Sequence, residues 1–82
     1  MTPDDARALV RRCLGEIAPD ADLDALEDAD DLRETLDLDS MDIFNLVAAI
    51  ADESGVEIPD REVGRLTTLG ALVERVAGAP AP

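Results

Sequence analysis

The chain has 82 residues and a formal net charge of −13, with no His and no Lys. A chain of this length forms one domain with a simple core and leaves little room for an enclosed active-site cleft. The negative charge disfavours binding to nucleic acid or to an anionic membrane surface and favours protein partners with basic patches. Leu, Ile, Val and Phe make up more than a quarter of the residues, which predicts a folded domain rather than a disordered one.

The cysteine content and the N-terminal residues bear on cellular location. A single cysteine, Cys13, excludes an internal disulfide and a thiolate metal cluster, and it fits a reducing compartment. The segment 1–5 lacks the basic and apolar regions of a signal peptide, and no apolar run reaches membrane-spanning length. We therefore expect a cytoplasmic monomer that does not associate with membranes.

The first predicted helix begins after Thr2, which precedes Pro3 and the capping-box acid Asp5. Apolar residues follow at helical spacing and predict a buried stripe that ends near Ala18 and Pro19: Ala6, Leu9, Val10, Cys13, Leu14 and Ile17. Residues 20–42 are then strongly acidic, with Arg33 as their one base, and predict a long solvated loop. Four leucines can pin this loop to the core, and the last two can form one helical turn: Leu23, Leu26, Leu32 and Leu36.

The second half of the chain predicts three more helices. One runs from Ser40 to Ser54 and stops at Gly55, and extended residues 56–59 follow it. A short helix covers residues 60–65, and Thr67 or Thr68 caps a last helix whose apolar residues are Leu69, Leu72, Val73 and Val76. Gly78 and Pro80 end it, and residues 78–82 are expected to fray. The prediction is an all-α, up-and-down four-helix bundle, three helices long and one short, in a single domain over residues 1–82.

The helix over residues 40–54 carries more apolar surface than a bundle needs. One stripe has the spacing of a bundle core and consists of Ile43, Leu46, Val47 and Ile50; a second stripe on another side consists of Met41, Phe44, Ala48 and Ala51. Part of the second stripe should stay exposed for a partner or a bound chain. The alternative is that Phe44, the only aromatic residue, plugs the bundle.

Ser40 is the residue of greatest interest, because its hydroxyl lies at the first turn of a predicted helix between Asp39 and Asp42. A serine in this place commonly does no more than satisfy helix-end N–H groups. However, the surrounding string Leu36-Asp37-Leu38-Asp39-Ser40-Met41-Asp42 resembles the Asp-Ser-Leu/Met attachment motif of the acyl carrier protein family. Two later segments, residues 56–60 and 66–69, resemble that family's loop after its second helix and the start of its last helix.

The resemblance covers about residues 3–77 and implies a function. Ser40 would receive 4′-phosphopantetheine from coenzyme A through a phosphopantetheinyl transferase, and the terminal thiol of this arm would carry acyl groups as thioesters to biosynthetic enzymes. The positive end of the helix dipole makes a phosphate at Ser40 electrostatically acceptable. Charges and exposed side chains around the arm are then the expected docking residues for basic patches on those enzymes: Asp39, Met41, Asp42, Phe44, Asn45, Ala48 and Asp52.

The sequence leaves the cargo and the pathway open between fatty acid, polyketide and other acyl products. The sparse acidic face of the Ser40–Ser54 helix suggests a specialised freestanding carrier, and the motif differs from the Gly-Gly-x-Ser pattern of peptidyl carriers. The aliphatic core suggests that the helices can part to admit an acyl chain.

Three other classes of function are alternatives to a carrier. An enzyme is disfavoured because the chain has no His, Lys or Tyr, and Cys13 lies on a buried stripe. Calcium binding by an EF-hand-like loop is suggested by Asp20, Asp22, Asp24 and Asp31, although Ala25 replaces the required glycine and Asp31 the bidentate glutamate. An unmodified acidic adaptor that binds a protein groove is the third alternative.

Overall fold

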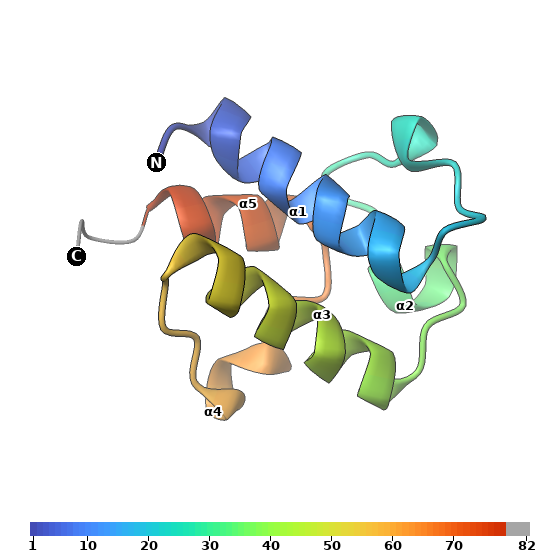
Figure 1. Ribbon diagram of the computed structural model, residues 1–82. Helices are drawn as coiled ribbons and strands as arrows, with labels where there is room; N and C mark the ends of the chain where they lie inside the picture. The colour runs from blue at the N-terminus through green and yellow to red at the C-terminus, as the bar shows by residue number, and fades with distance from the viewer. Residues whose placement is uncertain (79–82) are drawn as a thin grey trace.

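The computed structural model describes residues 1–78 and consists of helices around one aliphatic core (Figure 1). The elements in chain order are α1 (Pro3–Ile17), the 3₁₀ turn η1 (Leu23–Ala25), α2 (Leu32–Thr35), α3 (Ser40–Ser54), α4 (Asp60–Val63) and α5 (Leu69–Ala77). The three long helices confirm the predicted all-α bundle. Within residues 1–78 no strand forms, and the only β-type pairing is an isolated bridge between Asp31 and Thr68.

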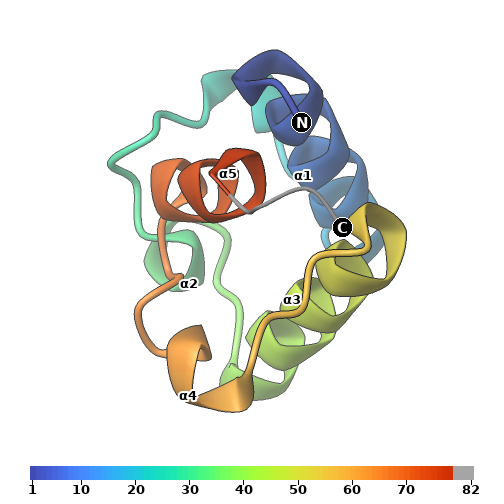
Figure 2. The ribbon, with the colours of Figure 1, turned by 90° about the vertical axis from the view of Figure 1, so that its left-hand side faces the viewer.

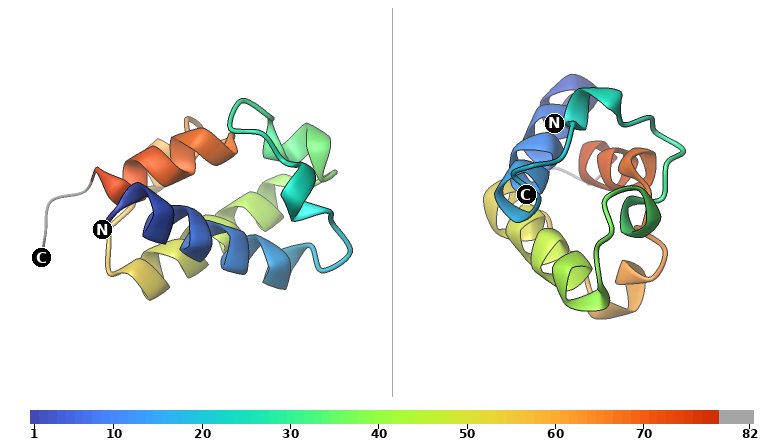
Figure 3. Two further views of the ribbon diagram at one scale, coloured as in Figure 1. Left: turned by 90° about the horizontal axis from the view of Figure 1, so that it is seen from above. Right: turned by 90° about the vertical axis from the view of Figure 1, so that its right-hand side faces the viewer.

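The long helices pack with α1 between its two neighbours, since α1 contacts both α3 and α5. Both neighbours run antiparallel to α1 (Figures 1 and 3). The short helix α4 lies against α3 at one edge of the bundle, as Figure 2 shows. No helix in the described part of the chain is both long and apolar enough to span a membrane.

Each long helix begins and ends as its sequence predicts. Thr2 caps α1 by accepting a hydrogen bond from the Asp5 N–H at 3.1 Å, and Thr68 caps α5 by accepting one from the Ala71 N–H at 3.1 Å. Gly55 ends α3 in the left-handed conformation at φ 74°, which glycine adopts without a Cβ penalty. The end of α5 lies at Gly78, and the expected stop at Pro80 and the rest of the tail lie outside the described residues.

The core contains the apolar stripes that the sequence predicts. All predicted core residues of α3 and α5 are buried, and in α1 only Ile17 is half-buried. The interpretation that Phe44 plugs the bundle is wrong, because its side chain is 44% exposed. The predicted helix over residues 60–65 is shorter than expected: it ends at Val63, because Gly64 is a poor helix former, and hydrogen-bonded turns continue the chain to Leu66.

The segment between α1 and α3 is more ordered than the solvated loop that its composition predicts. It contains η1 and α2, and the predicted anchors are present: Leu26 and Leu32 are buried, while Leu23 and Leu36 are half-buried against the core. Polar contacts that the sequence does not reveal hold the rest of the loop.

Asp28 is the main polar anchor of this segment. Its carboxylate accepts two hydrogen bonds from the Arg7 guanidinium, at 2.6 and 3.0 Å, and its carbonyl oxygen accepts one from the Gly70 N–H at 3.0 Å. The Arg7 guanidinium lowers the pKa of the Asp28 carboxyl. A Cβ on Gly70 would meet Asp28 atoms at 3.1 Å, so the glycine permits the close approach of the loop to α5.

Candidate functional site

The candidate site is built at the N-terminus of α3, where Asp39 is the N-cap residue. The Asp39 carboxylate accepts a hydrogen bond from the Asp42 N–H at 2.8 Å, and the Asp42 carboxylate accepts one from the Asp39 N–H at 3.3 Å. The two acids thus form a reciprocal capping box that satisfies backbone donors at the helix end. They also place negative charge at the positive end of the helix dipole.

Ser40 is the first residue of α3, and its side chain is exposed. The interpretation of Ser40 as a helix-capping residue is wrong, because Asp39 performs that role. Among the described residues no hydrogen-bond partner satisfies the Ser40 hydroxyl. Asp39 therefore caps the helix, and the adjacent Ser40 hydroxyl lies at the protein surface without a hydrogen bond to another described residue.

A pocket of about 220 Å³ opens beside Ser40 between α2, α3 and α4. Its wall combines four polar side chains with apolar ones and one glycine, and the lining residues are Arg33, Ser40, Ile43, Phe44, Asp60, Val63, Gly64 and Thr67. The sequence predicts Ser40 and Phe44 as site residues but misses the contributions of α2 and α4. The signal available for Arg33 is that it is the one base in a long acidic segment.

The residues expected to dock partners lie along one exposed side of α3. Met41 is 67% exposed and Phe44 44% exposed, and the side chains of Asn45, Ala48 and Asp52 are also exposed. Asp39 is exposed and Asp42 half-buried, both at the end that bears Ser40. The structure thus places five of the predicted docking residues on one exposed side of α3, with Asp39 and Asp42 beside the candidate attachment serine at its N-terminus. We call this surface the α3 face.

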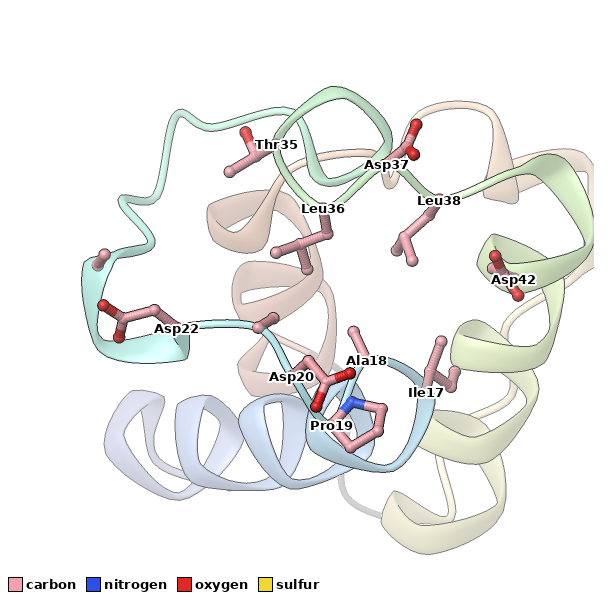
Figure 4. Close-up of a pocket in the computed structure, with 12 residues that line it drawn as sticks. Ile17, Ala18, Pro19, Asp20, Asp22, Thr35, Leu36, Asp37, Leu38 and Asp42 are labelled. Carbon is pink, nitrogen blue, oxygen red and sulfur yellow. The ribbon is translucent and has the colours of Figure 1, made fainter.

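A larger hollow of about 680 Å³ lies on another side of the α3 N-terminus and does not include Ser40 (Figure 4). The end of α1 and the segment before α3 form it, and Ile17, Leu36 and Leu38 line it with Asp42. Of these two hollows of the described residues, the one of about 220 Å³ is the candidate site, because Ser40 lines it.

Two of the four acidic residues of the calcium alternative, Asp24 and Asp31, make other contacts. The Asp31 carboxylate caps α2 by accepting hydrogen bonds from the N–H groups of Arg33 and Glu34, and Asp24 lies 3.8 Å from the Arg11 guanidinium. Within residues 1–78, no three side chains of His, Cys, Asp or Glu lie together in a way that could hold a metal ion. The calcium interpretation therefore has no ligand set in this part of the chain.

Cys13 is buried in the core, and its Sγ lies 2.8 Å from Glu53 Oε2, to which the thiol donates a hydrogen bond. Burial, followed by the hydrogen bond to the anionic carboxylate, raises the pKa of the Cys13 thiol to about 12. The thiol therefore stays protonated at neutral pH and is a poor nucleophile. The hydrogen bond has the opposite effect on Glu53, whose pKa it lowers.

The sequence profile described as phosphopantetheine attachment site matches residues 7–76. The match includes the exposed serine, its capping acids, all of α3 and most of α1 and α5. The chain therefore belongs to the family of phosphopantetheine-binding carrier domains. Members of this family are sites of covalent 4′-phosphopantetheine attachment, and they are carriers rather than catalytic domains. Carrier domains interact in general with phosphopantetheinyl transferases and with the enzymes that load and use acyl groups.

Proposed function

We propose that this chain is an acyl carrier whose prosthetic arm is attached to Ser40. The observation that supports the attachment point is the exposed hydroxyl of Ser40, which has no hydrogen-bond partner among the described residues while Asp39 caps the helix beside it. A hydroxyl in this position is accessible to a second enzyme and need not break a structural hydrogen bond before it reacts. The arm, when bound, supplies a thiol that carries acyl groups as thioesters.

The attachment step is a phosphoryl transfer between Ser40 and coenzyme A. The Ser40 oxygen forms a bond to the phosphorus that bears the pantetheine group, and the bond from that phosphorus to 3′,5′-ADP breaks. The serine proton is released, and 3′,5′-ADP departs with the electrons of the broken bond. The chain itself contributes the nucleophilic oxygen and its placement at the helix terminus, where N–H groups and the dipole favour negative charge. The transferase supplies the catalytic groups.

The decisive experiment is incubation with coenzyme A and a promiscuous phosphopantetheinyl transferase, followed by intact mass measurement. Ser54 is the only other serine and provides a matched control, because its hydroxyl accepts a hydrogen bond from the Val56 N–H at 3.1 Å at the far end of α3. We expect one added phosphopantetheine on the wild type and on Ser54→Ala, and none on Ser40→Ala. Modification of Ser40→Ala, or no modification of the folded wild type, would refute the proposal.

We propose the α3 face as the surface that docks the transferase and the acyl-handling enzymes. Its exposed apolar residues, Met41 and Phe44, lie beside the acids Asp39 and Asp42, so the surface fits a partner that combines a basic patch with an apolar contact. The charge of −13 disfavours self-association and supports a monomer. The free, buried thiol of Cys13 fits a reducing compartment and supports a cytoplasmic location.

We also propose that the pocket beside Ser40 admits the acyl chain towards the core. Ile43 and Val63 line this pocket and belong to the buried core cluster, so its inner wall is continuous with aliphatic packing. NMR comparison of the holo and acylated proteins tests this. Shifts at Leu46, Ile50, Val63 and Leu72 are expected on acylation, and shifts confined to the surface around Ser40 would contradict it.

A further inference from the structure

Among the residues that the structure describes, Arg33 is the one cationic residue that lines the pocket beside Ser40. Four of the seven arginines form ion pairs in the structure: Arg7, Arg11, Arg12 and Arg75. Arg33 has no carboxylate within 4.0 Å in the described part of the chain, although acidic residues surround it in the sequence and Asp60 lines the same pocket. Arg33 therefore lines the pocket without an ion pair among the described residues, and it also lines a neighbouring hollow with Asp31, Glu34 and Asp37.

The backbone that carries Arg33 is held firmly at the rim of this pocket. The Asp31 carboxylate accepts a hydrogen bond from the Arg33 N–H at 2.9 Å. The preceding residue, Leu32, is fully buried, and its N–H donates to the Thr67 carbonyl at 2.8 Å. Arg33 thus sits on a helical turn that is tied both to the core and to the segment before α5.

A further hydrogen bond connects Arg33 to the segment that leads into Ser40. The Arg33 carbonyl accepts a hydrogen bond from the Leu38 N–H at 3.0 Å, two residues before the serine. Asp37 makes this reversal of the chain possible with a positive φ of 55°, a conformation that Asp adopts more readily than most residues. The positions of Arg33 and Ser40 are therefore coupled through the backbone and not only through a shared pocket.

We propose that Arg33 binds the phosphodiester of the arm on Ser40. This inference rests on the proposed function, since it requires a phosphate at that serine. The phosphorus is bonded directly to the Ser40 oxygen, so its free oxygens lie next to the pocket that Ser40 and Arg33 both line. A guanidinium presents a planar fork of donors that matches phosphate oxygens.

The phosphodiester is the anion that this site fits, rather than an acidic group on the cargo. A cargo is attached at the far end of the arm, whereas the phosphate is fixed at its root beside Ser40. The phosphate also adds negative charge next to Asp39, Asp42 and Asp60. Arg33 offsets that charge on the side of Ser40 that faces the pocket, and it orients the root of the arm.

The test uses the holo protein, made as above, in wild type and in three exposed-site variants. Arg33→Gln removes the proposed ligand, Arg33→Lys restores the charge, and Arg61→Gln removes an equal charge from an exposed position outside the pocket. Two NMR signals are read: the ³¹P resonance of the phosphodiester and the Nε–Hε resonance of Arg33. Circular dichroism checks that each variant is folded.

We expect the Arg33 Nε–Hε resonance to shift when the apo protein becomes holo. We also expect the ³¹P resonance of Arg33→Gln to move towards that of free phosphopantetheine, with Arg33→Lys moving less and Arg61→Gln unchanged. An Arg33 resonance that does not move, or identical ³¹P shifts in the wild type and Arg33→Gln, would overturn the inference and leave the attachment at Ser40 intact. Absence of the added mass would instead refute the proposed function, and this inference with it.

Discussion

Along α3, the side chains of Ile43, Leu46, Val47 and Ile50 are at most 4% exposed, whereas Met41 is 67% exposed and Phe44 44% exposed. Both sets are apolar, so composition does not separate them. What separates them is position, because the first set belongs to the core cluster shared with α1 and α5, whereas Met41 and Phe44 lie outside it. Apolar character on the buried side stabilises the fold, and on the α3 face it is available to partners.

The largest expected effect on the free energy of unfolding comes from a substitution on the buried side of α3. Leu46 is fully buried, so Leu46→Ala removes core contacts and leaves a cavity. We expect a loss of about 2–5 kcal/mol in the free energy of unfolding, which is a large share of the stability of a small domain. Urea denaturation monitored by circular dichroism measures it. A loss as small as that of Met41→Ala would mean that burial does not distinguish the two sides of α3.

The sequence predicts the two apolar stripes of α3 well, because they depend on the local spacing of residues along a single helix. The bounds of α3, its stop at Gly55 and its four buried residues all follow from a period of 3.6 residues and from a glycine after the last turn. A short contiguous motif likewise predicts the candidate nucleophile and its acidic neighbours. None of these features depends on contacts between residues that are distant in the sequence.

The features that the sequence does not predict join residues far apart in the chain. Arg33 and Thr67 line one pocket because the N–H of Leu32 donates a hydrogen bond to the Thr67 carbonyl across the bundle. The anchoring of the acidic loop by Arg7 and Gly70, both through Asp28, is likewise a product of tertiary packing. The spacing of apolar residues does not reveal such contacts. The acidic composition therefore predicts a more solvated segment between α1 and α3 than the structure has.

The boundary between the two sides of α3 lies at its first turn, where Asp39 combines a structural and a surface role. Asp39→Ala removes the cap and should cost about 0.5–2 kcal/mol, while Asp39→Asn keeps an acceptor and should cost much less. Both variants lose the same charge. Urea denaturation measures the structural role, and the kcat/KM of phosphopantetheine transfer measures the surface role.

The comparison of these variants separates capping from docking. If the Asp39 charge docks the transferase, both variants lower kcat/KM to a similar extent, whereas only the alanine variant lowers stability. If transfer to the asparagine variant is as fast as to the wild type, Asp39 is a capping residue alone, and the docking surface does not include it.

The smallest effect on stability is expected on the α3 face itself. Met41 is 67% exposed, so Met41→Ala should change the free energy of unfolding by no more than about 0.5 kcal/mol. If the α3 face docks partners through apolar contact, the same substitution raises the KM for transfer, because the partner loses a desolvated contact beside Ser40. Met41→Leu is the matched control, since it keeps an apolar side chain of similar size and should retain the wild-type KM. An unchanged KM in Met41→Ala would show that exposure on this face is not used for docking, and a large loss of stability would show that Met41 belongs to the fold.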